Sequence, residues 1–397
     1  MLKQTEGSHA VAEAVALCRP EVICAYPISP QTHIVEGLGE MVKSGALANC
    51  EFINVESEFA AMSVAIGASA AGARAYTATA SQGLLFMAEA VFNASGLGLP
   101  IVMTVANRAI GAPINIWNDH TDAMSQRDCG WIQLFAEDNQ EALDLHIQAF
   151  RLGEELSLPV MVCMDGFILT HAYERVDIPA QPQVDAYLPR YEPRQILDPA
   201  EPVSIGAMVG PEAFMEVRYL AHIKQMQALE LIPGYAEEFR SVFGRGSGGL
   251  LHSYRTEDAD TIVVALGSVL GITCFRPWPH AAMRTALEGA KRVVVLEKSL
   301  AVGLGGIVSS NVHNSLAAPS TPVYTVIAGL GGRTITRASL HGVFADAIAG
   351  QLESVSFLDL DGAAVDRVLA REREVRRSGP IAEAVLRGMG APGARIG

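Results

Sequence analysis

Apolar and polar positions follow two alternating patterns along the chain. Short, mainly apolar runs such as "EVICAY", "ARAYTAT", "PIVMTVAN" and "PVMVCMD" predict buried strands. Between them, segments such as "HIVEGLGEMVKSG" and "NQEALDLHIQAFRLGEEL" repeat apolar residues every three or four positions, which predicts helices. Strands that are apolar throughout and separated by helices indicate a parallel sheet covered on both faces, so the pattern predicts an α/β fold.

The length indicates more than one domain, because single cores stop growing near roughly 250–300 residues and the chain has 397. We predict a first domain over residues 1–240, which includes a Pro-rich extended strap at about 172–203. After the linker "RGSGGL", a second α/β domain is expected over 250–362. The remainder, 363–397, predicts two short helices and is either a docking arm or a frayed terminus.

Composition and charge narrow the class of protein. Half of the residues are hydrophobic and 18% are charged, as in a well-buried α/β protein. The net charge of −14 argues against nucleic-acid binding, which needs a basic face. Glycine and proline interrupt the longest uncharged stretches, so no membrane span is expected. The N-terminus lacks the basic start and apolar core of a signal peptide, and we expect a cytoplasmic location.

The candidate metal ligands do not form a recognisable set. The six cysteines contain no CxxC pair and none has a histidine at ligand spacing, so a zinc or iron–sulfur site built by this chain alone is not expected. We interpret them as small buried residues. The loop residues Asp119, His120 and Asp122 could suggest a metal, but such short spacing favours local hydrogen bonds. We therefore predict no metal site in this chain.

Three polar residues follow predicted strands, where ligands of parallel sheets bind. Ser29 stands in a turn rigidified by the prolines of "YPISP". Glu58 begins a helix, and because apolar residues follow it, we expect its carboxyl to stay protonated. The alternative is an acid that only complements the helix dipole.

Arg108 directly follows the run "PIVMTVAN". A guanidinium at a strand end can bind a carboxylate with two hydrogen bonds, which makes Arg108 a candidate anion site. The alternative is an ion pair with Asp119 or Asp122 in the next loop.

These segments together resemble a known family. "AYPISPQT", "VESEFAAMSVAIGASAAGARAYTATASQGL" and "PVMVCMDGFILTH", followed later by "FRPWP" and "GLGGRTIT", are similar to the alpha subunit of the thiamine-diphosphate-dependent 2-oxoacid:acceptor oxidoreductases, the pyruvate:ferredoxin oxidoreductase group. The resemblance covers nearly the whole chain. It implies a pyrimidine-binding thiamine-enzyme domain, followed by a domain like the transketolase C-terminal domain.

The resemblance also implies residue roles. Glu58 matches the catalytic glutamate that hydrogen-bonds the aminopyrimidine ring, and Arg108 matches the arginine that binds the substrate carboxylate. Ser29, also expected at the substrate, stands where threonine is common. With Glu58, the residues expected to bind the cofactor are Tyr26, Pro27, Ile28 and Ser29.

The resemblance implies oxidative decarboxylation of a 2-oxoacid to acyl-CoA with coenzyme A as co-substrate. Thiamine enzymes hold Mg²⁺ and the diphosphate with a GDG motif, and the only near match, "MDGF" at 164–167, lacks the first glycine. Partner chains are therefore expected: a beta subunit with the diphosphate and Mg²⁺, a gamma subunit and a ferredoxin-like iron–sulfur subunit. Pyruvate is the favoured substrate, followed by an arylglyoxylate such as phenylglyoxylate, because Ser29 could enlarge the pocket, and then by a branched-chain 2-oxoacid. A non-catalytic scaffold subunit is the alternative from another class.

One stretch departs from the family. In "VALGSVLGITCFRPWP", relatives place a helix and a strand before the "FRP" motif, whereas here Leu270 and Gly271 are adjacent. Either the second domain has lost a βα element or the printed sequence omits a stretch, and we favour omission. Trp278 is a second departure, since relatives usually carry phenylalanine.

Overall fold

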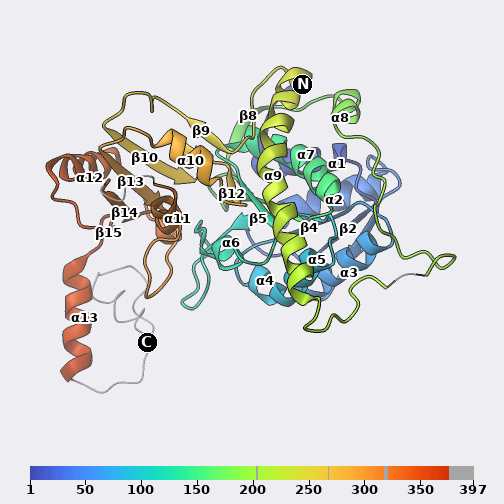
Figure 1. The fold of residues 1–397 in the computed structure, drawn as a ribbon, viewed down its shortest axis with the longest axis horizontal. Helices are drawn as coiled ribbons and strands as arrows, with labels where there is room; N and C mark the ends of the chain where they lie inside the picture. The colour runs from blue at the N-terminus through green and yellow to red at the C-terminus, as the bar shows by residue number, and fades with distance from the viewer. Residues whose placement is uncertain (203, 267, 317–320, 375–397) are drawn as a thin grey trace.

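A computed structural model describes residues 1–397 except 203, 267, 317–320 and 375–397. The described chain forms two α/β units that lie side by side in Figure 1, the first coloured from blue to yellow-green and the second in orange. Each unit has its own, mainly parallel sheet. The α/β fold class predicted from the sequence is confirmed.

The first unit is built on a seven-stranded sheet of order β12-β6-β7-β5-β4-β2-β3. All neighbouring pairs are parallel except β12 and β6. The carboxyl ends of its parallel strands therefore meet at one edge. The strands are β2 (Val22–Ala25), β3 (Glu51–Asn54), β4 (Ala75–Thr79), β5 (Val102–Asn107), β6 (Ile132–Phe135), β7 (Val160–Asp165) and β12 (Cys274–Arg276).

Helices cover both faces of this sheet. Successive strand residues point to opposite faces, so Val102 packs in one apolar cluster and Met103 in another. The first cluster includes side chains of α1, α2 and α7, and the second includes side chains of α3, α4 and α5. The helices of the first unit are α1 (Gly7–Leu17), α2 (Thr32–Ser44), α3 (Glu58–Ala70), α4 (Ser81–Phe86), α5 (Ala88–Gly96), α6 (Thr121–Ser125), α7 (Asn139–Leu156), α8 (Gln181–Tyr187) and α9 (Phe214–Phe243).

The segment expected as an extended strap, 172–203, contains regular structure in its first part. β8 (Tyr173–Asp177) pairs antiparallel with β1 (Leu2–Glu6), and α8 follows. The sequence did not predict the pairing of β1 with β8, because the two strands lie far apart in the chain and no local pattern records which strand pairs with which.

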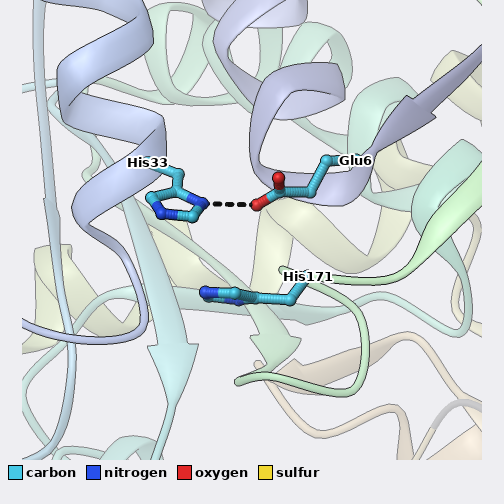
Figure 2. Close-up of side chains that lie close together, drawn as sticks. All are labelled: Glu6, His33 and His171. Carbon is cyan, nitrogen blue, oxygen red and sulfur yellow. Dashed lines mark hydrogen bonds and ion pairs between the residues drawn. The ribbon is translucent and has the colours of Figure 1, made fainter.

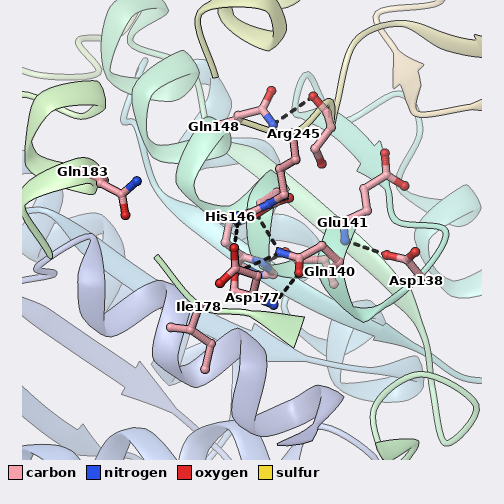
Figure 3. Close-up of polar contacts among 12 residues, drawn as sticks. Asp138, Gln140, Glu141, His146, Gln148, Asp177, Ile178, Gln183 and Arg245 are labelled. Atoms are coloured by element: carbon pink, nitrogen blue, oxygen red, sulfur yellow. Dashed lines mark hydrogen bonds and ion pairs between the residues drawn. The ribbon is translucent and has the colours of Figure 1, made fainter. Parts of the chain in front are cut away.

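Polar contacts join β8 to α7, as Figure 3 shows. The side chain of Gln140 accepts from the Asp177 N–H at 2.7 Å and donates to the Asp177 carbonyl at 3.3 Å. Arg245, just after α9, binds both carboxylate oxygens of the buried Asp144 at 2.6 and 2.9 Å. Burial raises the pKa of Asp144 to about 6 although Arg245 opposes that rise. These contacts hold α7, β8 and the end of α9 together.

The second unit contains a six-stranded sheet of order β15-β14-β13-β10-β11-β9, in which only β9 runs antiparallel to its neighbour. Its strands are β9 (Leu251–Ser253), β10 (Thr261–Leu266), β11 (Ser268–Ile272), β13 (Arg292–Glu297), β14 (Val323–Ile327) and β15 (Val355–Phe357). Its helices are α10 (His280–Ala286), α11 (Val308–Ser315), the 3-10 turn η1 (Leu330–Gly332), α12 (Arg337–Ala349) and α13 (Gly362–Glu374).

The two units are not separated cleanly in sequence. β12, which carries the start of the "FRPWP" motif, adds to the edge of the first sheet beside β6 although it lies in the range expected for the second domain. The second apolar cluster also continues from α3 and α5 into β10, β13 and α11. The units therefore share packing at their junction.

The order of β10 and β11 requires a longer connection than the printed sequence contains. The two strands are parallel, with Val264 beside Leu270 and Leu266 beside Ile272. Only residues 267–269 stand between the paired segments, whereas a crossover between parallel strands normally needs a dozen or more residues. Leu270 and Gly271, where the sequence suggested an omission, are consecutive residues of β11, so the short connection lies before them. Omission of a crossover from the printed sequence remains our prediction.

Two further expectations concern the ends of the described chain. The predicted tail over 363–397 is described only as far as Glu374, where α13 ends, and the rest of that tail lies outside the described residues. Within the part of the chain that the structure describes, none of the helices combines the length and apolar character that crossing a bilayer requires.

We predict that the subunit isolated from its source is heavier than the 42.2 kDa of the printed sequence. The excess should correspond to at least about a dozen residues, the minimum for a parallel crossover. Intact-mass spectrometry of that subunit measures this directly, with the chain produced from the printed sequence as the control. A native mass of 42.2 kDa would show instead that the second domain has lost the βα element.

Candidate active-site edge

The turn after β2 is held by Gln31, which is completely buried. Its side-chain amide donates to the carbonyl of Tyr26 at 2.9 Å and to that of Ala78, in β4, at 3.1 Å. Its backbone N–H donates to the Ile28 carbonyl at 2.9 Å. The exposed side chain of Ser29 therefore stands on a fixed backbone at the carboxyl edge of the sheet. The sequence contained no specific signal for Gln31.

Asp122 organises the neighbouring strand ends and is also completely buried. Its carboxylate accepts hydrogen bonds from the backbone N–H groups of Ser81, Arg108 and Ala123 at 2.7–3.0 Å, and from the Asn107 amide at 2.8 Å. Burial raises the pKa of Asp122, and the four donated hydrogen bonds oppose that rise. One carboxylate thus joins the end of β4, the end of β5 and the start of α6.

Arg108 is mostly buried, and its guanidinium contacts backbone carbonyls. Nη1 donates to the Ser29 carbonyl at 2.8 Å and Nε donates to the Asn115 carbonyl at 3.4 Å. Burial lowers the pKa of Arg108, and the negative charge of Asp122 opposes that shift. No ion pair joins the guanidinium to a described carboxylate, so the alternative pairing with Asp119 or Asp122 is not what the structure contains. The structure instead brings Arg108 and Ser29 together.

Glu58 is the first residue of α3 and is only 7% exposed. The preceding residue, Ser57, caps α3, and its hydroxyl accepts a hydrogen bond from the Ala60 N–H at 3.2 Å. The Glu58 carboxylate packs against Gly83, where an added Cβ would lie 2.6 Å from Glu58 Oε1 and 2.6 Å from Thr79 Oγ1. Glycine inside a helical pattern signals such a close approach, so Gly83 could have been found from the sequence.

The strand order places the three predicted residues side by side along the edge. Glu58 follows β3, Ser29 follows β2 and Arg108 follows β5, with β4 between β2 and β5. Neighbouring strands are about 4.8 Å apart, so β3 and β5 are separated by about 14 Å. Ser29 therefore lies between the carboxyl and the guanidinium.

A charged network joins this edge to the second domain. Asp165, at the end of β7, accepts from His120 Nε2 at 2.7 Å and from the Asn118 amide at 3.1 Å, and it forms an ion pair with Lys298. The His120 N–H also donates to the Lys298 carbonyl at 2.8 Å. Burial alone would raise the pKa of Asp165, but His120 and Lys298 together lower it well below its usual range. The sequence did not single out Asp165 or Lys298.

The second domain also supports the loop that follows Arg108. The Asn115 amide donates to the Gly331 carbonyl at 3.0 Å, and an added Cβ at Gly332 would lie 2.6 Å from Trp117 Cβ. Both glycines have positive φ, which glycine adopts without steric cost in a tight turn. The loop is therefore shaped from both domains.

The residues considered as metal ligands in this loop point to different partners. Asp119 accepts from the Thr121 N–H, His120 binds Asp165, and Asp122 accepts the four N–H groups described above. The six cysteines are all buried and unpaired, as predicted. Burial raises the pKa of Cys50 to about 11 and that of Cys24 to about 12, as expected for unreactive core thiols.

The fold and this edge define an α/β protein of the thiamine-diphosphate-binding class. Residues 13–237 match the family "Pyruvate flavodoxin/ferredoxin oxidoreductase, thiamine diP-bdg", and residues 264–340 match "Pyruvate:ferredoxin oxidoreductase core domain II". The chain belongs to this family, as an alpha subunit of a 2-oxoacid:ferredoxin oxidoreductase. The family resemblance is thus confirmed.

Named relatives cover most of the chain. It is 46% identical to "Pyruvate synthase subunit PorA" of Methanosarcina barkeri, over 89% of this chain and 96% of that protein. It is 37% identical to "Ketoisovalerate oxidoreductase subunit VorA" of Pyrococcus abyssi, over 87% and 93%. A solved 2-oxoglutarate:ferredoxin oxidoreductase from Magnetococcus marinus has a TM-score of 0.63 at 17% identity, with 89% of this chain and 65% of that chain covered. This last likeness shows the fold.

The alignments also include positions that this chain lacks. The Methanosarcina alignment has 386 positions but includes 89% of the 397 residues, about 353, which leaves about 33 positions filled only by the relative. The Pyrococcus abyssi alignment has 369 positions and includes 87%, about 345, which leaves about 24. Both totals exceed the dozen residues that a parallel crossover normally needs.

We predict that Gly83→Ala destabilises the chain by about 1–3 kcal/mol, because its Cβ would overlap the Glu58 carboxylate and the Thr79 hydroxyl. Gly96→Ala is the matched control, since this helical glycine has no neighbour within 4 Å of the added Cβ. The control should change stability by no more than about 1 kcal/mol, and in the stabilising direction. Urea unfolding measures both, and equal effects would contradict the close packing.

We predict that Lys298→Met lowers the free energy of unfolding at pH 7 by about 1.5–3 kcal/mol, the usual range for a charged hydrogen bond. The Asp165 pKa is depressed in the folded state, so its contribution is complete above the unfolded value of about 3.9 and is lost as pH falls toward the folded value. Between pH 5 and pH 3, stability should therefore fall less steeply in Lys298→Met than in the wild type.

Lys291→Met is the control for that comparison, because its pair with Asp260 is exposed at both side chains. We expect a change of no more than about 1 kcal/mol. If the free energy of unfolding, measured in urea, falls equally steeply between pH 5 and pH 3 in the wild type and in Lys298→Met, the ion pair with Asp165 does not contribute to stability as proposed.

Proposed function

We propose that the chain supplies the pyrimidine-binding half of a thiamine diphosphate site in an enzyme that oxidatively decarboxylates a 2-oxoacid. The observation that carries the proposal is the Glu58 carboxyl. It is buried, it is not needed as a helix cap, and it accepts no hydrogen bond from a described residue. A buried carboxyl that has no hydrogen-bond partner among the described residues is available to bind a cofactor ring.

The other predicted residues support the same assignment. Thr79 Oγ1, beside Glu58 and Gly83, is buried without a hydrogen-bond partner among the described residues, so a polar group next to Glu58 is left for a ligand. We assign cofactor binding to Tyr26, Pro27, Ile28 and Ser29, whose backbone Gln31 holds in place. Thiamine diphosphate, when bound, supplies the carbon nucleophile and the electron sink for decarboxylation.

Arg108 is proposed to bind and orient the substrate carboxylate. Its Nη1 and Nε hold the Ser29 and Asn115 carbonyls, and these contacts fix the guanidinium plane. Nη2 has no hydrogen bond to a described residue and remains available for a carboxylate oxygen. The structure therefore supports an anchored contact that orients the substrate beside Ser29.

Partner chains are proposed to complete the enzyme. The side chains of Tyr26, Phe59 and Phe86 are 39%, 38% and 60% exposed at or near the carboxyl edge, as suits a surface that another subunit covers. We propose a beta subunit that carries Mg²⁺ and the diphosphate, a gamma subunit and a ferredoxin-like subunit with iron–sulfur clusters. The buried cysteines of this chain are not placed to hold such clusters. The cytoplasmic location stays a prediction.

We propose pyruvate as the substrate and coenzyme A as the acyl acceptor, because the relatives of 41–46% identity are named pyruvate synthase subunits. The Pyrococcus abyssi ketoisovalerate subunit supports a branched-chain 2-oxoacid as the second candidate. An arylglyoxylate remains the alternative suggested by Ser29. Activity of the assembled complex on these three substrate classes discriminates among them.

We predict that Glu58→Gln lowers turnover of the assembled complex roughly 10²-fold or more, because glutamine can hydrogen-bond the ring but is a poor proton donor. Size-exclusion chromatography should show unchanged assembly. Glu56→Gln, at an exposed acid two residues earlier, is the control and should turn over normally. Normal turnover of the Glu58→Gln complex would contradict a catalytic role for this chain and would favour the alternative, a non-catalytic scaffold subunit.

A further inference from the structure

Three potential metal ligands meet away from the residues assigned to catalysis. Glu6 ends β1, His33 is the second residue of α2 and His171 lies in the loop after β7. Figure 2 shows the Glu6 carboxylate facing the His33 ring, with the His171 ring beside them. One ligand atom from each residue lies within 4.8 Å of the other two, and among the described residues this is the only such group of three.

We propose that Glu6, His33 and His171 bind a divalent transition-metal ion of the zinc type. Two imidazoles and one carboxylate are a donor set that zinc and its first-row neighbours accept, with water completing the coordination. Bonds of about 2.0–2.1 Å place tetrahedral ligand atoms about 3.4 Å apart. The widest separation must therefore shrink by up to about 1.4 Å, and the His33 side chain, which is 43% exposed, has room to move.

An ion pair between Glu6 and His33 explains only part of this arrangement. His33 Nδ1 lies 2.6 Å from Glu6 Oε1, which is a complete contact by itself. The His171 ring nevertheless packs against His33, with centroids 4.8 Å apart. Two protonated imidazoles at that distance would repel each other. A shared cation bound by neutral rings accounts for both histidines.

The surroundings of His171 resemble those of a metal ligand. Its Nδ1 lies 2.8 Å from the hydroxyl of the buried Thr170, which also accepts from the Phe167 N–H at 2.8 Å. Such a contact orients the ring and, when Nδ1 carries the proton, leaves Nε2 with a lone pair for the ion. The Phe167 ring covers His171 at 4.7 Å between centroids.

The role of the ion would be structural. It would join the end of β1 and the start of α2 to the loop after β7. α2 follows directly from the turn that carries Ser29, and an added Cβ at Gly166, in the same loop, would lie 2.7 Å from Pro30. Binding would thus stiffen the backbone behind that turn. This proposal departs from the sequence prediction that the chain holds no metal, and it does not depend on the proposed function.

The test is metal binding by the full chain after chelator treatment and dialysis. We expect isothermal calorimetry with Zn²⁺ to give one equivalent per chain, and Co²⁺ to give a visible absorption band of a low-coordinate site. His33→Gln and His171→Gln should each weaken binding at least about tenfold, the usual effect of losing a contact at such sites. His9→Gln is the control, because this exposed ring lies 6.5 Å from His33 but belongs to no ligand group.

Absence of stoichiometric Zn²⁺ binding by the wild type, or equal affinity in the two ligand variants and the control, would overturn the proposal. Circular dichroism establishes that each variant is folded. If a histidine variant unfolds, Glu6→Gln replaces it. In that case anomalous scattering at the zinc edge from a crystal of the wild-type chain also decides the question, by showing a peak among the three side chains or none.

Discussion

The buried carboxylate of Asp122 is the interaction on which the candidate active-site edge depends. A charge taken out of water is costly unless its lone pairs are satisfied, and here four N–H groups satisfy them. Three of these donors are Asn107 at the end of β5, Arg108 directly after it and Ser81 two residues after β4, so the carboxylate ties the two strand ends together. The direction in which Arg108 leaves β5 is set by the same contact, because its own N–H is one of the donors.

The second domain contributes to that edge although none of the predicted site residues lies in it. Lys298 and His120 neutralise Asp165, and the turn at Gly331 and Gly332 packs on the loop that follows Arg108. Asp165 without Lys298 would keep a buried charge with fewer partners. The position of the loop is thus coupled to the packing of the two domains, and the shared apolar cluster at β10 and β13 makes that packing extensive.

The same edge shows why the chain belongs in an assembly. Buried contacts fix the backbone at this edge, while a side chain such as that of Ser29 remains exposed to solvent. Gln31 provides such contacts for the turn that carries Ser29. The Glu58 carboxylate packs against Gly83 and does not cap α3, because Ser57 does so. A surface that is rigid inside and open outside can bind another subunit with little reorganisation.

The amino-acid sequence by itself determined the fold class, the strands β2, β4, β5 and β7, and the placement of Ser29, Glu58 and Arg108 at strand ends, because periodicity and parallel-sheet topology are local or repetitive signals. The family could also be recognised, since its motifs are continuous segments. Only the tertiary structure decided what Arg108 contacts, because both proposed carboxylate partners were nearby in sequence while the actual acceptors are backbone carbonyls. It also decided the β1–β8 pairing, the placement of β12 in the first sheet, and the meeting of Glu6 with two histidines. Each of these joins segments separated by more than a hundred residues or by several elements, and their proximity follows from packing, which no local pattern encodes.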